Sequence, residues 1–246
     1  MGCGGLALKT NIAAVELAQV CMDASNDVAG GFTAGLGPHA ILRSSPGQAL
    51  HLDFAASPPA ATACPLTFHE YGLGLLVVDT HVPHPDEAAV IRQRMAETHQ
   101  AVAALDVASI GAMQGMRGAL ARIEALDDPL LRKRARHVFT ENERVELVFD
   151  ELTGTAPAHE RFVAIGKAMY RSHASLEVDF DVSNDALNLA VDVAFNAGAL
   201  GARLAGSGRG GSVVALIRHT QAASTAQLID EAFREEGFPR PSFALI

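Results

Sequence analysis

Aromatic residues are scarce in this 246-residue sequence: tryptophan is absent, tyrosine occurs twice and aromatics make up 5% of the chain. The hydrophobic fraction is nevertheless 49%, which is ordinary for a globular protein with a sizeable core. Alanine, valine, leucine and glycine must therefore build most of that core. A chain of this length is expected to form one large domain or two small ones.

Cysteine is also sparse, and Cys3, Cys21 and Cys64 show no CxxC or Cys/His spacing. An odd number so spaced supports neither a disulfide framework nor a zinc site, and it favours a reducing compartment. No apolar run reaches the roughly 18 residues of a membrane-spanning helix, and the N-terminus lacks the basic region of a signal peptide. These absences predict a cytoplasmic protein without a membrane partner.

Positive charge is in the minority, with 19 Lys and Arg against 28 Asp and Glu and a formal net charge of −9. Nucleic acids and anionic membranes bind surfaces where cations are concentrated, so a nucleic-acid partner is not expected. The one basic run, residues 132–136, lies in helix-like sequence and is interpreted as a solvated helix face.

Hydrophobic periodicity predicts helices and strands interspersed without a regular βαβ rhythm, which is typical of an α+β fold. Strands are expected over 50–54, 73–78, 212–217 and 243–246, and a loop over 29–38. Helices are expected over 11–22 with Asn11 as N-cap, from Asp86 with a buried stripe of Ile91, Met95, Thr98, Val102 and Leu105, and over 115–150 with a break near 127–129. Two more helices are expected, one capped by Ser183 and a last one with a Ser224/Gln227 capping box and Gly237 just after its end.

Five segments, in this order along the chain, together resemble the galactokinases of the GHMP sugar-kinase superfamily. They are residues 47–54 (GQALHLDF), 75–81 (LLVVDTH), 137–145 (HVFTENERV), 172–183 (SHASLEVDFDVS) and 200–216 (LGARLAGSGRGGSVVAL). The resemblance implies a two-lobed GHMP-kinase fold, with an incomplete first lobe over 1–130 and a ferredoxin-like C-terminal lobe over 131–246. It also implies transfer of the ATP γ-phosphate to galactose, with Mg²⁺, giving galactose 1-phosphate and ADP.

The resemblance begins only about where the family's second motif is expected, so the chain is predicted to lack the family's N-terminal segment. That segment supplies an arginine and sugar-contacting groups. The second motif is a Gly-Leu-Ser-Ser-Ser loop that presents backbone N–H groups and hydroxyls to phosphate. The nearest stretch here, residues 4–10 (GGLALKT), retains two glycines but few hydroxyls. A degraded phosphate loop and an unstructured chain start both remain open.

The family's catalytic aspartate is predicted to be absent as well. Counting back from Gly47 places the sugar-site loop, with Gly35 and Gly37, on the family's base-bearing segment, and Gly37 on the aspartate. Glycine carries no acid–base group, and His39 is the nearby residue that could titrate near neutral pH. The family's sugar-contacting tyrosine is likewise predicted to be replaced, by Ile91.

The third motif is the best preserved of the family's ligand-binding segments. Its glycines permit positive φ angles and close backbone approach, which an anion-binding nest requires. An arginine stands where the family has phenylalanine and adds a cation. The predicted nucleotide and phosphate loop consists of Gly206, Ser207, Gly208, Arg209, Gly210 and Gly211.

Other polar residues are given structural interpretations. The group of Asp79, His81, His84 and Asp86 is expected to be an exposed loop rather than a metal site. Glu141 and Asn142 are expected to make polar packing contacts. The two aspartates of the 172–183 segment, Asp179 and Asp181, are expected to be turn or cap residues.

Two hypotheses follow. The first is a galactokinase that uses ATP and Mg²⁺ and is inactive or severely impaired as this chain. The second is a non-catalytic GHMP-fold remnant that binds a sugar, a nucleotide, a protein partner or nothing. A shortened first lobe would also deprive the strands at 48–54 and 73–78 of pairing partners or covering surface, which predicts self-association through an open sheet edge.

Overall fold

The computed structural model describes residues 12–28, 33, 35–83, 86–206 and 208–246. The chain divides into two compact units, which we call the N-terminal unit (residues 1–63) and the C-terminal unit (residues 64–246). Each unit is described by itself.

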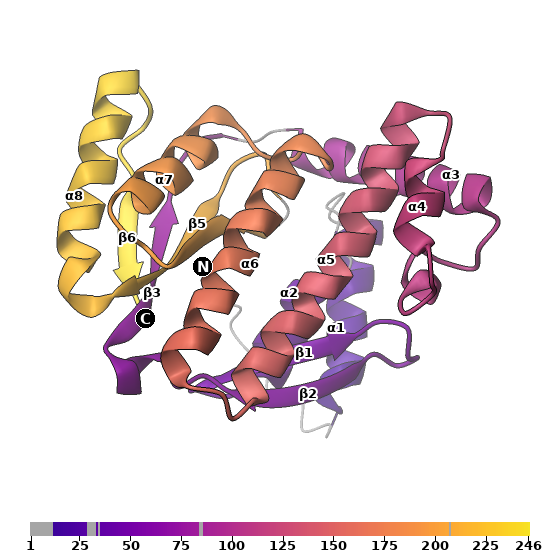
Figure 1. The fold of residues 1–246 in the computed structure, drawn as a ribbon, viewed down its shortest axis with the longest axis horizontal. Helices are drawn as coiled ribbons and strands as arrows, with labels where there is room; N and C mark the ends of the chain where they lie inside the picture. Colours follow the sequence, from indigo (N-terminus) through magenta and orange to yellow (C-terminus); the bar gives the residue numbers. More distant parts are fainter. Residues whose placement is uncertain (1–11, 29–32, 34, 84–85, 207) are drawn as a thin grey trace. The chain divides into compact units, whose positions relative to one another are not determined.

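The N-terminal unit contains two helices and a two-stranded sheet, coloured indigo to purple in Figure 1. Helix α1 (Ala14–Asp23) continues into a π-helical turn, η1 (Ala24–Val28), and helix α2 (Leu36–Arg43) packs against α1. Strands β1 (Gln48–Asp53) and β2 (Ala60–Pro65) form the sheet. The strand expected near 50–54 is therefore confirmed, whereas Asn11, the expected N-cap, lies outside the described residues.

The expectation of a loop over 29–38 is wrong for its last part, because α2 begins at Leu36. Gly35 precedes the helix with a φ of 100°, and a Cβ added to it would lie 2.8 Å from the Met22 sulfur. Glycine is therefore the residue that suits this position. Pro38 is compatible with the helix because the first-turn N–H groups have no intrahelical partner.

The C-terminal unit is built on an antiparallel sheet of four strands in the order β4-β5-β3-β6. The four strands and two of the helices that cover them are β3 (Leu73–Asp79), α7 (Asp185–Asn196), β4 (Gly201–Ala205), β5 (Ser212–Arg218), α8 (His219–Glu236) and β6 (Ser242–Leu245). Further helices, over residues 87–178, lie between β3 and α7 in the chain. A β-α-β-β-α-β path with this strand order is ferredoxin-like, as predicted for the C-terminal lobe.

Strand β3 lies between β5 and β6 and is hydrogen-bonded along both edges. The expectation that residues 73–78 would lose their pairing partners is therefore wrong, because strands far along the sequence supply both neighbours. The sheet draws on residues from both sides of the predicted 130/131 boundary, and the division into lobes at that point stays a prediction.

Both faces of the central strands are buried, which explains the continuous apolar run of β3. Leu76 and Val78 belong to a core that includes residues of α7 and α8, whereas Leu73 belongs to a second core with Phe162 and Ile165 of helix α6 (Ala158–Val178). Alternate residues of the strand thus face different helix layers.

A long helix, α5 (Pro129–Thr153), runs beside α6, as Figure 1 shows. Asp128 caps it by accepting N–H bonds from Leu130 and Leu131, and Pro129 stands at its first position. The predicted break near 127–129 is confirmed, since proline is favoured at that position of a helix. Helices α3 (Glu87–Leu105) and α4 (Ala119–Glu124) pack against α5.

Two predicted caps are wrong. Asn184, not Ser183, caps α7 by accepting a hydrogen bond from the Leu187 N–H at 2.9 Å. Helix α8 already begins at His219, so Ser224 lies inside it and donates instead to the Gln221 carbonyl. Gly237 does follow α8 with a φ of 75°, as expected.

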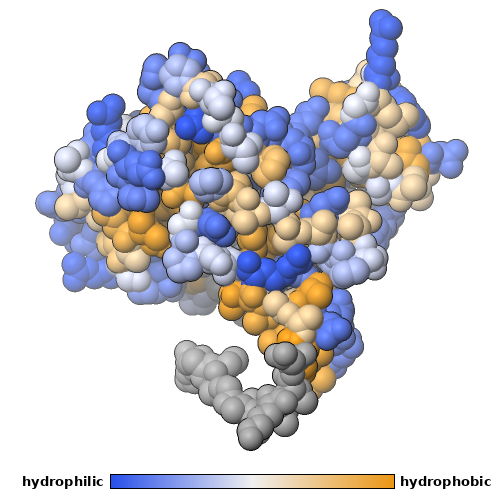
Figure 2. All heavy atoms as spheres, turned by 90° about the horizontal axis from the view of Figure 1, so that it is seen from below, coloured by the Kyte–Doolittle hydropathy of each residue, from blue (hydrophilic) through white to orange (hydrophobic). Residues whose placement is uncertain are grey.

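On the face drawn in Figure 2, apolar side chains are interspersed with polar ones. Isolated exposed apolar residues are normal on folded proteins. Several occur in the N-terminal unit: Ile12, Val20, Val28, Leu36, Ile41 and Phe54. No helix in the described part of the chain combines the length and the hydropathy needed to cross a membrane.

Candidate functional site

The predicted phosphate loop connects β4 to β5 in the C-terminal unit. Gly206, Gly208 and Gly211 have φ angles of 79°, 85° and 83°, and Arg209 has a φ of 66°. Four left-handed residues in so short a connection require glycine at most positions. Ser207, which belongs to the same predicted loop, lies outside the described residues.

Two residues outside the motif fasten this loop to the rest of the unit. Thr80, directly after β3, donates its N–H and its hydroxyl to the Gly211 carbonyl, at 3.0 and 2.8 Å. The Val182 carbonyl accepts the Arg209 N–H. A Cβ on Gly208 would lie 2.2 Å from that same carbonyl oxygen, so close packing of the backbone explains this glycine. Sequence reasoning missed both Thr80 and Val182 as anchors.

Two other glycines of the loop, Gly206 and Gly211, leave space open to a ligand, whereas Gly210 is buried. A Cβ on Gly206 or Gly211 would meet no atom within 4 Å. The Arg209 side chain is exposed, and none of the residues that the structure describes pairs with its guanidinium group. A left-handed glycine loop with an exposed arginine suits an anionic ligand such as phosphate.

The motif segments 137–145 and 172–183 meet around one largely buried carboxylate. Glu141 of α5 accepts hydrogen bonds from Ser172 Oγ at 2.6 Å, from Arg203 Nη1 at 3.0 Å and from Arg144 Nε at 2.7 Å. Burial raises the pKa of Glu141, but the two arginines and the serine together outweigh burial and hold it below its usual value. The expected packing role of Glu141 is confirmed, since it joins α5, α6 and β4.

Two histidines complete this polar layer. His137 shares a 2.9 Å hydrogen bond with Ser175 and stacks on Phe180, with 4.4 Å between ring centroids. Burial lowers the pKa of His137 to about 4, so it is neutral at pH 7. His173 accepts the Leu204 N–H, at 3.3 Å, and burial lowers its pKa as well. Both histidines hold elements together in their neutral form.

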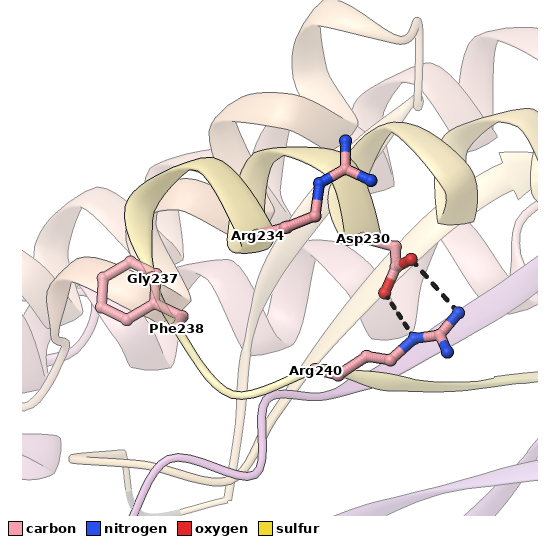
Figure 3. A pocket seen from close by; sticks show the side chains of 5 residues that line it. All are labelled: Asp230, Arg234, Gly237, Phe238 and Arg240. Atoms are coloured by element: carbon pink, nitrogen blue, oxygen red, sulfur yellow. Dashed lines mark hydrogen bonds and ion pairs between the residues drawn. The ribbon is translucent and has the colours of Figure 1, made fainter.

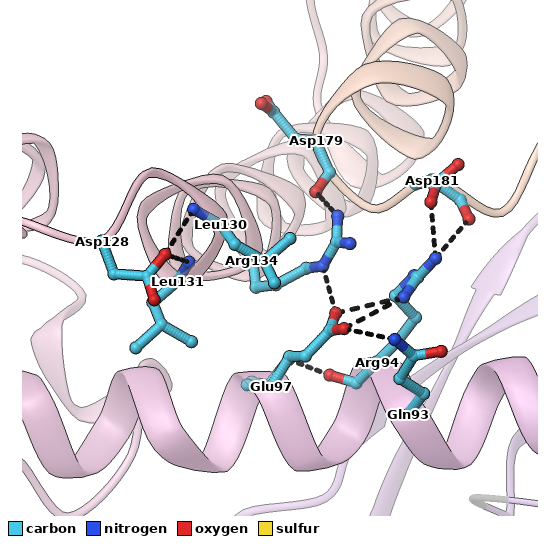
Figure 4. A network of polar contacts seen from close by, with 10 residues as sticks. Gln93, Arg94, Glu97, Asp128, Leu130, Leu131, Arg134, Asp179 and Asp181 are labelled. Carbon is cyan, nitrogen blue, oxygen red and sulfur yellow. Dashed lines mark hydrogen bonds and ion pairs between the residues drawn. The ribbon is translucent and has the colours of Figure 1, made fainter.

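A second buried cluster surrounds Glu97 and is drawn in Figure 4. Arg94 and Arg134 both donate to the Glu97 carboxylate. Arg134 is 3% exposed, so the interpretation of residues 132–136 as a solvated face is wrong at its central residue. The predicted turn residues Asp179 and Asp181 are hydrogen-bonded to this cluster, because Arg134 donates to the Asp179 carbonyl and Arg94 donates to Asp181.

In the N-terminal unit, the predicted catalytic position carries no reactive group. Gly37 is exposed in the first turn of α2, and a Cβ there would meet no atom within 4 Å. His39 is 1% exposed; its ring meets Phe54 edge-on at 5.9 Å, and its Nδ1 lies 3.3 Å from Arg43 Nη1. Gly35 is buried at the N-cap position, directly before α2.

The remaining sequence candidates do not form a metal site within the described ranges. No group of three or more His, Cys, Asp or Glu residues there could hold a metal ion. His81 instead contacts the Arg240 carbonyl at 2.9 Å and Ser242 Oγ at 3.2 Å, beside Asp79. His84 and the degraded phosphate stretch 4–10 lie outside the described residues.

A cavity of about 440 Å³ opens where α8 ends, lined by Asp230, Arg234, Gly237, Phe238 and Arg240. Figure 3 shows that its main polar feature is the ion pair between Asp230 and Arg240. The Arg240 side chain is 85% exposed, and such surface pairs contribute little energy. The pocket presents no buried nucleophile, base or unpaired carboxylate.

Comparison with known proteins identifies the fold and its relatives. Residues 155–234 match the family model "GHMP kinases C terminal". A galactokinase of Mycobacterium bovis (strain BCG / Pasteur 1173P2) is 35% identical over 98% of this chain and 64% of its own length, and one of Streptomyces coelicolor is 32% identical over 92% and 57%. The crystal structure of Lactococcus lactis galactokinase complexed with galactose superposes with a TM-score of 0.85 at 24% identity, covering 96% of this chain and 60% of that one.

The matches therefore cover nearly the whole chain but less than two thirds of each relative's length. The third-motif loop and the polar layer around Glu141 are built from residues inside the matched region. The chain is similar to galactokinases over nearly its whole length and spans 64% of the length of its mycobacterial relatives, and its residues 155–234 match the GHMP kinases C terminal model.

Proposed function

We propose that this chain binds the phosphates of ATP at the 206–211 loop and does not phosphorylate galactose by itself. In this proposal the loop descends from an ancestor that converted ATP and galactose to galactose 1-phosphate and ADP. The observation that carries the proposal is the contrast between the two sites: an anchored loop with an exposed arginine, and a glycine at the expected catalytic position.

The case against turnover rests on the missing base. A positioned acid or base contributes about 10²–10⁴ in rate, and Gly37 offers none. His39 does not replace it, because its ring is enclosed by Phe54 and Arg43 and is 1% exposed. Phosphoryl transfer further needs a phosphate cradle and charge neutralisation from several chain segments. The 206–211 loop meets only part of that need.

The case for nucleotide binding rests on the fit of the loop to an anion. Gly206 and Gly211 would let phosphate oxygens approach the backbone, and Arg209 would neutralise charge. Mg²⁺ would neutralise phosphate charge when bound with ATP; it is commonly held by one or two carboxylates plus phosphate oxygens. The contribution of this chain is to bind and orient the phosphates.

We expect no galactose-dependent ADP release from the purified 246-residue chain, because Gly37 has no acid–base group and His39 is 1% exposed. A coupled ADP-release assay at saturating galactose and magnesium-ATP measures this. Heat-denatured protein gives the background rate, and His39→Ala tests the remaining candidate base. Turnover clearly above background would refute the proposed lack of catalysis, and its loss in His39→Ala would identify the base.

We expect Gly208→Val to weaken ATP binding at least tenfold, because its Cβ would clash with the Val182 carbonyl and displace the loop. Isothermal titration calorimetry with ATP measures the affinity. Gly115→Val is the matched control: Gly115 also has a positive φ, of 72°, but a Cβ there meets no atom within 4 Å. Equal ATP affinity in the two folded variants would show that ATP does not bind at the 206–211 loop.

The first hypothesis of the sequence analysis, galactokinase activity, is tested by the turnover assay. A cytoplasmic location follows from the proposed use of ATP and is part of the proposal. Self-association through a sheet edge also stays a prediction, and sedimentation velocity that finds only monomer across a wide concentration range would count against it.

A further inference from the structure

The segment 179–182, between α6 and α7, contacts the phosphate loop directly. The Val182 carbonyl accepts the Arg209 N–H, and Gly208 packs against the same residue. Val182 is itself 1% exposed, so it has little freedom to move independently of its surroundings. The position of this segment therefore sets the position of the loop.

Two buried arginines hold the same segment from the other side. Arg134 of α5 donates to the Asp179 carbonyl. Arg94 of α3 donates to Asp181 twice, at 2.5 Å to Oδ2 and at 3.3 Å to the backbone carbonyl. Asp181 has a φ of 55°, a left-handed conformation that is unfavourable for a residue with a side chain. The contacts from Arg94 stabilise that conformation.

One carboxylate fixes both arginines, as Figure 4 shows. Glu97 is 7% exposed; its Oε2 accepts from Arg134 Nε at 2.6 Å, and both of its oxygens lie 3.2 Å from Arg94 Nη1. Burial raises the pKa of Glu97, but its two arginine partners outweigh burial and lower the pKa overall. The carboxylate is therefore charged and matched to its partners.

We propose that Glu97, together with Arg94 and Arg134, positions the phosphate loop by clamping segment 179–182. The inference rests on the proposed function, because it gives the cluster a role in holding the ligand-binding loop. The contacts favour this over simple helix packing: both arginines reach past Glu97 and end on main-chain carbonyls of the segment that binds Arg209. These are positioning residues, which act on a ligand only through the loop.

Glu97→Gln is the direct test, because it removes the charge at nearly constant volume and leaves the arginines imperfectly paired. We expect the Arg209 amide, whose partner is the Val182 carbonyl, to exchange its hydrogen at least tenfold faster by NMR. The Ala215 amide in β5 should keep its rate, which separates local loosening from global unfolding. Asp230→Asn, which breaks the surface pair with Arg240, is the control and should change neither rate.

ATP titration of the same proteins gives the second readout. We expect affinity to fall at least tenfold in Glu97→Gln and to stay constant in Asp230→Asn. If Glu97→Gln does not fold, Arg94→Lys replaces it, since lysine keeps the charge but lacks the planar fork that joins Glu97 to Asp181. An unchanged Arg209 exchange rate, or equal acceleration at Ala215, would overturn the inference. Failure of the wild-type chain to bind ATP would instead refute the proposed function and leave the exchange result to decide the clamp.

Discussion

Gly166→Ala is expected to lower the free energy of unfolding by about 3–5 kcal/mol, among the largest effects of a single substitution. Gly166 lies in α6 where that helix crosses β4. A Cβ added there would lie 2.0 Å from the Leu200 carbonyl oxygen, and one added to Gly201 would lie 2.4 Å from the Gly166 Cα. Both clashes are with backbone atoms, so no side-chain rotation can relieve them.

The substitution forces α6 away from the sheet, which opens the core formed by Phe162, Ile165 and Leu216. Cavities and lost contacts in a packed core are costly. Urea unfolding followed by circular dichroism measures the effect. Gly111→Ala is the control, because the nearest atoms to its added Cβ are 3.7 Å away. Equal midpoints for the two variants would show that the α6–β4 approach can relax more easily than the backbone geometry indicates.

The sequence predicted elements well where one local signal dominates. The apolar run of β3, the proline at the start of α5 and the glycine after α8 each lie where expected. The 206–211 loop was also predictable, since its glycines occur in a recognisable motif. Prediction failed for α2, because the loop ends at Gly35, three residues before the predicted end at Pro38.

Long-range charge pairing was not predictable from the sequence. The expected stripe of α3 is confirmed at Leu105, but Met95 and Thr98 are only half-buried, and the other buried positions of the helix are Arg94, Glu97 and Ala101. A periodic pattern predicts that charged residues face solvent. Glu97 is buried because it pairs with Arg134 of α5, which is 37 residues away and cannot be identified from the local sequence. Val182 and Thr80 were missed for the same reason, because their contacts with the glycine loop join distant segments.

Acidification from pH 7 to pH 5 is expected to lower the free energy of unfolding by about 2 kcal/mol through His137 alone. Burial lowers the pKa of His137 from its ordinary value of 6.5 to about 4. Between pH 6.5 and pH 4 the His137 side chain binds a proton in the unfolded chain but not in the native protein. The free energy of unfolding therefore falls as the pH falls. Well above pH 6.5 both states are neutral, and the contribution is constant. Burial lowers the pKa of His173 too, which adds to the loss in the same direction.

Urea unfolding at several pH values between 5 and 7 tests this. The window lies above the ordinary pKa of carboxylates, so groups such as Glu97, whose pKa is lowered, contribute little to the slope there. His137→Gln removes the titrating ring while keeping a polar group near Ser175, and the slope should shrink by at least half. His159→Gln is the control, because that side chain is 80% exposed, and its slope should match that of the unsubstituted chain. If His137→Gln keeps the full slope, His137 is not held neutral by burial and another group causes the acid sensitivity.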